Sequence, residues 1–322
     1  MPLSDLTLAE CREYRPVLPE PADFDRFWSG TLGEAERLPL DARFERVDTG
    51  LVQVETYDVG FAGYAGQRVS GWLRLPAGAA GPLGCVVEYL GYGRGRGLAH
   101  QSLFWANAGY AHLIMDTRGQ GWSSALGTTP DPGATDSGSV PGFLTRGLTD
   151  RDAYYYRRVF TDAVRCVAAA RSHPSVDPER VVVTGISQGG GITLAVAGLV
   201  PGLAGAMPDV PFLCDIRRGA ETAACPPYTE IADFLRLHRS SAEQVFTTLS
   251  YFDGALMAAR SRTPALFSIA MMDRICPPST CFSAYNAYAG RKDVRVYEFN
   301  DHEGGVEHHQ LEQLAWLRAL LG

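Results

Sequence analysis

Apolar residues in the second half of the chain form short, continuous runs separated by longer segments with helical periodicity. Runs of this kind are typical of strands that are buried on both faces of a sheet. We expect buried strands within residues 85–90, 110–116, 181–183, 204–214, 264–272 and 294–299. We expect helices within residues 150–171, 192–199 and 307–321. Strands that alternate with helices predict an α/β fold with a mostly parallel, doubly wound sheet and helices on both faces.

The N-terminal part of the chain follows two other patterns. Phe24, Phe27 and Trp28 have the i, i+3, i+4 spacing of one apolar helix face. Residues 1–43 are therefore interpreted as an N-terminal helical arm. Residues 44–75 alternate between apolar and polar positions and contain turn glycines, which predicts antiparallel strands.

Composition fits one large globular unit. The chain has 322 residues, of which 46% are hydrophobic and 20% charged, so it can bury a sizeable core. Because no repeat or low-complexity linker divides it, residues 1–322 are expected to form a single domain. Residues 228–260 have helical patterns, and we expect a cap-like helical insertion above the sheet at about residues 215–260.

Charge excludes two classes of partner. The formal net charge is −7, and basic residues cluster only in short pairs such as Arg157-Arg158, which argues against nucleic acid and against an anionic membrane surface. The most apolar stretch, residues 181–200, contains Ser187, Gln188 and five glycines. A buried strand and helix explain it better than a membrane span.

Two features predict a cytoplasmic protein. Residues 1–5 lack the basic and apolar regions of a signal peptide. The seven cysteines form no Cys-x-x-Cys pair, and we expect them to be reduced and packed as small hydrophobic residues.

Candidate chemistry centres on Gly185-Ile186-Ser187-Gln188-Gly189, which follows three consecutive valines and precedes a helical segment. Gly-x-Ser-x-Gly between a strand and a helix is typical of a nucleophile elbow, in which a sharp turn exposes the serine hydroxyl. The Gln188 amide, at the helix N-terminus, would point at whatever Ser187 attacks. The same residues would also suit a glycine-rich turn with a capping serine.

A second glycine-rich loop, residues 91–97, follows the strand at 85–90. Its glycines lack the spacing of a dinucleotide-binding loop. Ester hydrolases with a serine elbow place a second oxyanion donor in such a loop, and the backbone N–H of Tyr92 is our candidate. A plain flexible turn is the alternative.

A serine nucleophile requires a base, and the base requires an orienting group. Ser187, Asp273 and His302 follow three different predicted strands, and the carboxyl ends of parallel strands share one edge of a sheet. Asp273 could instead cap the helix that begins at Pro277-Pro278. His302 together with His308 and His309 has no recognised metal-ligand spacing, so we predict no metal and no cofactor.

At these motifs the chain resembles the cephalosporin C deacetylase and acetyl xylan esterase family of α/β-hydrolases, carbohydrate esterase family seven. The three-part signature of that family is matched by Arg118-Gly119-Gln120, Gly185-Ile186-Ser187-Gln188-Gly189 and His302-Glu303. Further likeness lies in residues 143–147, 154–159 and 273–280, and it extends from about Phe27 to the end of the chain. One departure is Leu90, which stands before Gly91 where the family pattern has a histidine.

The resemblance implies a serine esterase that deacetylates small O-acetylated substrates, such as acetylated xylo-oligosaccharides and cephalosporin C, through an acetyl-enzyme. It implies Ser187 as nucleophile, His302 as base and Asp273 as orienting acid, with an oxyanion hole formed by the backbone N–H groups of Tyr92 and Gln188. It implies supporting roles around the site for Arg118, Gly119, Gln120 and Glu303.

The resemblance also implies a homo-oligomer, most simply a hexamer built as a trimer of dimers, with active sites facing an inner cavity. The long loop at residues 122–149, rich in glycine and proline, is a candidate lid or subunit contact. The alternatives are a broad short-chain carboxylesterase, a prolyl oligopeptidase, which would need room for a propeller domain, and a non-catalytic binding protein on a hydrolase fold.

Overall fold

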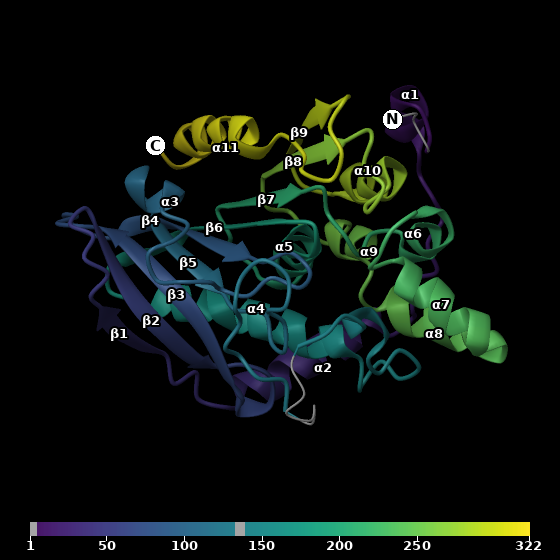
Figure 1. Ribbon diagram of the computed structural model, residues 1–322, viewed down its shortest axis with the longest axis horizontal. Helices are drawn as coiled ribbons and strands as arrows, with labels where there is room; N and C mark the ends of the chain where they lie inside the picture. The colour runs from purple at the N-terminus through teal and green to yellow at the C-terminus, as the bar shows by residue number, and fades with distance from the viewer. Residues whose placement is uncertain (1–4, 133–138) are drawn as a thin grey trace.

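A computed structural model describes residues 5–132 and 139–322 of the chain. These residues build one nine-stranded sheet with the order β1-β2-β3-β5-β4-β6-β7-β8-β9. The pairs β1–β2, β2–β3 and β3–β5 are antiparallel. From β5 onward all neighbouring strands are parallel. The predicted mostly parallel α/β fold is therefore confirmed (Figure 1).

The strands are β1 (Arg43–Val47), β2 (Val54–Ala62), β3 (Arg68–Pro76), β4 (Leu83–Tyr89), β5 (Ala111–Met115), β6 (Val176–Ile186), β7 (Gly205–Asp209), β8 (Ala265–Ala270) and β9 (Lys292–Tyr297). The α-helices are α1 (Leu8–Glu13), α2 (Phe24–Glu36), α3 (Phe104–Asn107), α4 (Tyr155–Ser172), α5 (Gln188–Leu199), α6 (Ile216–Thr222), α7 (Thr229–Leu237), α8 (Ala242–Ser250), α9 (Gly254–Ala258), α10 (Pro278–Ala287) and α11 (Val306–Leu321). Three short 3₁₀ helices are η1 (Tyr64–Gly66), η2 (Phe143–Thr145) and η3 (Arg239–Ser241).

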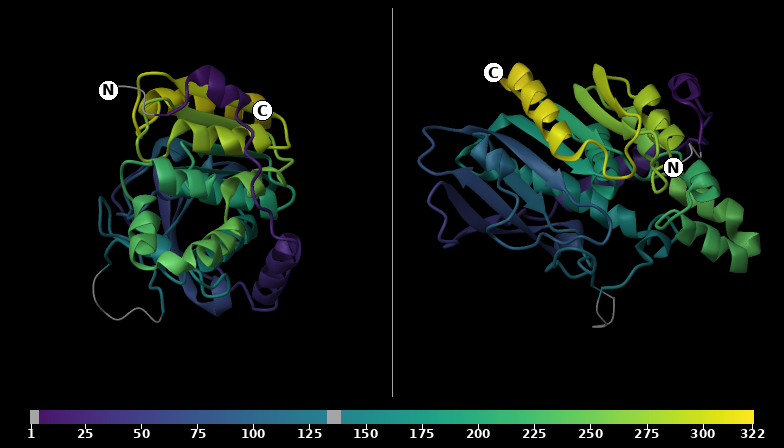
Figure 2. Two further views of the ribbon diagram at one scale, coloured as in Figure 1. Left: turned by 90° about the vertical axis from the view of Figure 1, so that its right-hand side faces the viewer. Right: turned by 45° about the horizontal axis from the view of Figure 1, so that its top comes forward.

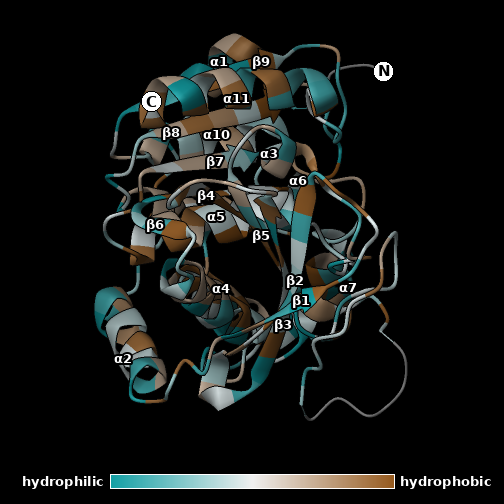
Figure 3. Cartoon of the chain, turned by 90° about the vertical axis from the view of Figure 1, so that its left-hand side faces the viewer, coloured by the Kyte–Doolittle hydropathy of each residue, from teal (hydrophilic) through white to brown (hydrophobic). Residues whose placement is uncertain are grey.

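Helices cover both faces of the sheet. One face packs against α4, α5 and α10, and the other against α3 and α11 (Figures 1 and 3). Side chains of a central strand point alternately to the two layers, so Val87 joins the larger core under α4 and α5, whereas Val86 joins the smaller core under α11. Both layers exclude water, which explains why these strands are continuously apolar.

The helices around the N-terminal and inserted segments lie outside this sandwich. Helix α2 is anchored by Trp28, whose Nε1 donates to the carbonyl oxygen of Tyr251 at 2.8 Å. Helix α1 packs against α10. Helices α6, α7 and α8 lie beyond the carboxyl ends of the central strands, with α7 and α8 projecting from the body (Figures 1 and 2). No helix in residues 5–132 and 139–322 is both long and apolar enough to cross a membrane.

Several boundaries differ from those expected. Helix α4 begins at Tyr155 because residues 151–153 form a turn, and it ends at Ser172 because His173, before a proline, is extended. Strand β6 begins five residues before the valine run because Val176 pairs with Leu83. The one-turn helix α3 has no periodic signal in the sequence.

In its described parts, residues 122–132 and 139–149, the long loop is mostly irregular apart from η2. The nearly uncharged stretch from Gly133 to Thr145, with Asp136 inside it, lies partly outside the described residues.

Candidate active site

The turn between β6 and α5 holds Ser187 in a backbone conformation that side-chain-bearing residues rarely adopt, with φ 59° and ψ −119°. Ser187 N–H donates to the Asp209 carbonyl oxygen at 2.9 Å, and Phe212 N–H donates to the Ser187 carbonyl oxygen at 2.9 Å. A Cβ at Gly185 would lie 2.6 Å from the Tyr89 carbonyl oxygen, so this position requires glycine. These features have the geometry of a nucleophile elbow.

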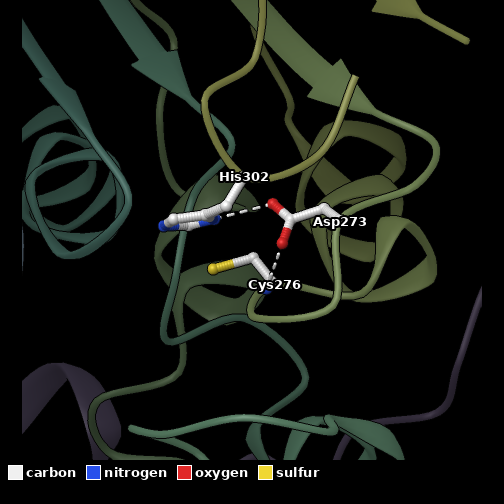
Figure 4. A group of neighbouring side chains, drawn as sticks. All are labelled: Asp273, Cys276 and His302. Carbon is white, nitrogen blue, oxygen red and sulfur yellow. Dashed lines mark hydrogen bonds and ion pairs between the residues drawn. The ribbon is translucent and has the colours of Figure 1, made fainter. Parts of the chain in front are cut away.

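Two of the predicted residues meet directly. His302, on the loop after β9, places its Nδ1 2.8 Å from Asp273 Oδ2 (Figure 4). The other oxygen, Asp273 Oδ1, accepts the N–H groups of Ile275 and Cys276 at 2.8 Å each. Asp273 is also fully buried. Its own turn orients the carboxylate, which in turn fixes the His302 ring.

Neighbouring acids do not take this role. Asp301 Oδ1 accepts the backbone N–H of His302 at 2.9 Å rather than the ring. Asp116 accepts the backbone N–H groups of Arg96, Thr128 and Thr129, and so organises the loops behind the site.

No sequence motif predicts a role for Cys276 at the site, yet its sulfur lies beside Asp273 and His302. Ligand atoms of Asp273, Cys276 and His302 lie within 4.8 Å of one another, the one such group of potential metal ligands within the described residues (Figure 4). Burial raises the pKa of the Cys276 thiol, and hence disfavours the thiolate that a metal would need. Both Asp273 oxygens already accept hydrogen bonds, so the cluster is better suited to a carboxylate–imidazole pair than to a metal ion.

The glycine loop and the elbow are joined through glutamine side chains. Gln120 Oε1 accepts the Gly93 N–H at 2.7 Å, and Gln120 Nε2 donates to Gln188 Oε1 at 2.8 Å. Gln188 Nε2 donates to the Leu90 carbonyl oxygen at 3.0 Å. The loop is thus held through the backbone of Leu90, and this contact does not depend on the side chain that departs from the family pattern.

Both candidate oxyanion donors have N–H groups without an acceptor in the described part of the chain. Gln188 is the first residue of α5, where the N–H has no partner within the helix. No group in the described part of the chain accepts the Tyr92 N–H.

Arg118 and Gly119 lie behind the site. Arg118 Nε and Nη2 donate to the two oxygens of Asp162 on α4, at 2.6 and 2.9 Å. Burial opposes the charge on Arg118, but the ion pairs with Asp162 and Asp131 outweigh it and raise the arginine pKa. Gly119 has φ +69°, and a Cβ there would lie 2.9 Å from the ring of Phe143.

Glu303 is exposed and accepts a hydrogen bond from Asn300 Nδ2 at 2.9 Å, within the loop that carries His302. It also lines a cavity of about 270 Å³ together with Ile186 and Asp209. Neither Ser187 nor His302 lines that cavity, which lies beside the elbow. In the pair His308-His309, both ring nitrogens of His309 face protein groups: Nε2 lies 2.8 Å from Asp209 Oδ1 and Nδ1 lies 3.0 Å from Tyr297 Oη.

A parallel sheet with a strained serine elbow and a carboxylate–histidine pair at its carboxyl edge defines the α/β-hydrolase class. The sequence profile of the acetyl xylan esterase family matches residues 1–320. The chain belongs to this family, and it is a carboxylic ester hydrolase, as the resemblance implied.

Individual relatives agree with this family assignment. Acetyl xylan esterase from Paenibacillus sp. R4 is 39% identical, with a TM-score of 0.91 over 98% of this chain and 100% of that chain. Acetyl xylan esterase 1 from Thermoanaerobacterium sp. JW/SL YS485 is 32% identical, with a TM-score of 0.89 over 99% of this chain and 100% of that chain. Acetyl esterase Axe7A from Xylanibacter ruminicola is 27% identical over 94% of this chain and 68% of its own length.

Proposed function

We propose that this enzyme removes acetyl groups from small O-acetylated substrates, including acetylated xylo-oligosaccharides and cephalosporin C. The observation that carries the proposal is the pair formed by Asp273 and His302, 2.8 Å apart, at the same sheet edge as the strained Ser187. The names of its relatives, acetyl xylan esterases and an acetyl esterase, support acetyl as the acyl group.

In the proposed reaction the Ser187 hydroxyl attacks the ester carbonyl while His302 Nε2 takes its proton. Asp273 accepts the Nδ1–H, selects the tautomer and stabilises the imidazolium. His302 then protonates the leaving alcohol, which leaves an acetyl-enzyme on Ser187. His302 then takes a proton from water as the water oxygen attacks this ester, the bond between Ser187 Oγ and the acyl carbon breaks to release acetate, and His302 returns the proton to Ser187 Oγ.

Charge that develops on the carbonyl oxygen would be stabilised by the N–H groups of Tyr92 and Gln188. The first N–H at a helix N-terminus carries a partial positive charge, which favours the Gln188 amide for this task. One such donor contributes roughly 3–4 kcal/mol to transition-state stabilisation. Neither a metal nor a cofactor has a role in these steps.

A hydrolysis panel tests the proposal. Purified enzyme is given acetylated xylo-oligosaccharides, cephalosporin C, and p-nitrophenyl esters of increasing acyl length. We expect kcat/KM to be highest for acetyl esters and to fall steeply as the acyl chain lengthens. Similar rates from acetate to octanoate would instead identify a broad short-chain carboxylesterase, and loss of acetyl specificity would overturn the proposal.

A further inference from the structure

Helix α7 of the inserted segment carries a carboxylate that reaches the glycine loop. Tyr92 Oη donates to Glu230 Oε1 at 2.8 Å. The same oxygen accepts the Gly142 N–H at 3.2 Å, and Glu230 Oε2 accepts the Leu144 N–H at 3.2 Å. One side chain therefore joins three segments that are far apart in the sequence: the glycine loop, the loop that contains η2, and α7.

The Tyr92 hydroxyl has its full complement of partners. Besides donating to Glu230, it accepts the N–H groups of Gly142 at 3.1 Å and Phe143 at 2.8 Å. A phenol has one donor and two acceptor sites, so its own proton must go to an acceptor. An ionised carboxylate at position 230 is acceptor-only, and it satisfies the hydroxyl and the neighbouring amides together.

The rest of Tyr92 is also held on several sides. Its ring packs edge-on against Trp122, with centroids 5.2 Å apart, and against Phe143 at 6.4 Å. The next residue, Gly93, is fixed by its N–H to Gln120, and its carbonyl oxygen accepts two backbone N–H groups. Tyr92 is thus clamped between Gln120, which accepts the N–H of the next residue, and Glu230, which accepts the Tyr92 hydroxyl.

A structural ion pair does not explain Glu230. Within the described residues, no lysine or arginine nitrogen lies within 4.0 Å of its carboxylate. Burial raises the pKa of Glu230, and the hydrogen bonds from Tyr92 and from the backbone at Leu144 oppose this rise. Arg146 also lowers this pKa, but from beyond ion-pair distance. A half-buried carboxylate without a direct ion pair is costly unless its hydrogen bonds are well made, and its donors here are the Tyr92 hydroxyl and the backbone N–H groups of Gly142 and Leu144.

The start of α7 is itself anchored. Tyr228 Oη donates to the Cys214 carbonyl oxygen at 3.0 Å and accepts the Cys214 N–H at 3.1 Å. Cys214 follows the β7 segment whose backbone also brackets Ser187. The elbow region and the glycine loop are therefore both connected to one turn of α7.

We propose that Glu230 is a positioning residue for the oxyanion hole: it holds Tyr92 so that the Tyr92 N–H faces the oxygen that becomes negatively charged. The proposal rests on the proposed function, in which that N–H is an oxyanion donor. It assigns to the inserted helix α7 a part in transition-state stabilisation, besides any part in covering the site.

The test compares Glu230→Gln and Glu230→Ala with Asp233→Asn, a matched control at an exposed position of the same helix. Steady-state kinetics on p-nitrophenyl acetate are normalised to active sites by fluorophosphonate titration. We expect Glu230→Ala to lower kcat about tenfold, less than the 10²–10³ that follows removal of an oxyanion donor. Glu230→Gln keeps one acceptor oxygen, so its kcat should decrease less. In both variants KM should stay within about twofold of the wild-type value.

Binding of methylboronic acid supplies a readout that a purely structural role would not change. Its tetrahedral adduct with the serine oxygen places a hydroxyl in the oxyanion hole. We expect Kd for the boronic acid to increase by the same factor by which kcat/KM decreases. In the Glu230→Gln background, the further substitution Tyr92→Phe should change both quantities little. The control should match wild type in both measurements.

Unchanged kcat in Glu230→Gln and Glu230→Ala would overturn the proposal. The proposal would also be overturned if the loss of kcat paralleled a loss of active enzyme or a lower thermal midpoint, while the affinity of each active site for the boronic acid stayed constant. The underlying function fails separately: in that case Ser187→Ala would retain acetyl esterase activity and fluorophosphonate would not label the wild-type protein.

Discussion

At the scale of single residues, the site depends on backbone strain that its surroundings maintain. A positive φ costs a residue such as Ser187 about 1–3 kcal/mol, and it persists only where neighbouring contacts determine it. Here the carbonyl oxygen of Asp209 and the N–H of Phe212 hold the two sides of the serine peptide. The strain therefore presents the hydroxyl at the sheet edge without any ligand.

The proposed triad can be tested by single substitutions. Ser187→Ala should abolish turnover of p-nitrophenyl acetate and leave the thermal midpoint close to that of wild type. Asp273→Asn should lower kcat by roughly 10⁴, because an amide facing Nδ1 favours the wrong tautomer. Near-normal activity in Asp273→Asn, with loss in Asp116→Asn or Asp253→Asn, would show that the acid is misassigned.

At the scale of elements, buried charges join loops to helices. Arg118, just after β5, pairs with Asp162 in the middle of α4, and both side chains are almost completely buried. Asp162 Oδ1 also accepts the Tyr64 N–H at 2.8 Å, which ties the antiparallel part of the sheet to the same pair. Breaking such a pair leaves an uncompensated charge in the interior.

Arg118→Met should therefore destabilise the fold by about 3–5 kcal/mol, because Asp162 would remain buried without its cation. The exposed pair Arg43–Asp41 gives a matched control, and Arg43→Met should change stability by less than about 1 kcal/mol. Urea unfolding followed by circular dichroism measures both. Equal effects in the two variants would contradict the assigned role of the Arg118 pair.

A second element-scale prediction concerns Asp253, which joins α9 to the start of α6. Burial raises its pKa to about 7, although backbone N–H groups of Ile216, Ala255 and Asp215 donate to it. Between about pH 4 and 7 the folded protein then binds more protons at this site than the unfolded chain, so this contribution to stability is lost as pH rises.

Asp253→Asn should remove that contribution. The free energy of unfolding of wild type minus that of Asp253→Asn should decrease from pH 4 to pH 7, as measured by urea unfolding at several pH values. Asp233→Asn, at an exposed position, should give a difference that does not vary with pH. A difference that rises with pH would mean that the folded-state pKa of Asp253 is lowered.

At the scale of the whole molecule, a closed assembly would decide which substrates can enter. We propose a homo-oligomer, most simply a hexamer, in which the loop at 122–149 contributes a subunit contact. In its described part Leu126 and Val140 are strongly exposed, with 70% and 57% of their surfaces accessible. Apolar side chains at such positions favour a protein contact over open solvent.

Two measurements test the assembly. Analytical ultracentrifugation should give a mass about six times that of the 34.9 kDa chain. If active sites face an enclosed cavity, short acetylated xylo-oligosaccharides and cephalosporin C should be deacetylated much faster than acetylated xylan. A monomer, or equal rates on polymer and oligomer, would rule out this arrangement and leave the triad proposal unaffected.

The sequence alone determined the features that depend on local chemistry. Apolar runs such as residues 181–183 are buried strands, because a continuous run can exclude water only between two layers. The glycines around Ser187 mark an elbow, because a Cβ would collide with neighbouring backbone. The family signature at 118–120, 185–189 and 302–303 led to the correct family and to an ester hydrolase.

The tertiary structure alone decided what depends on contacts between distant segments. The sequence predicted Asp273 as the partner of His302, but only the folded chain shows the contact itself: His302 Nδ1 lies 2.8 Å from Asp273 Oδ2, while Asp301 Oδ1 accepts the backbone N–H of His302. No sequence pattern indicates a role for Glu230, because acidic residues are common in the first turn of a helix. Its hydrogen bond to Tyr92 spans 138 positions, and no local pattern of hydrophobic and polar residues encodes such a contact.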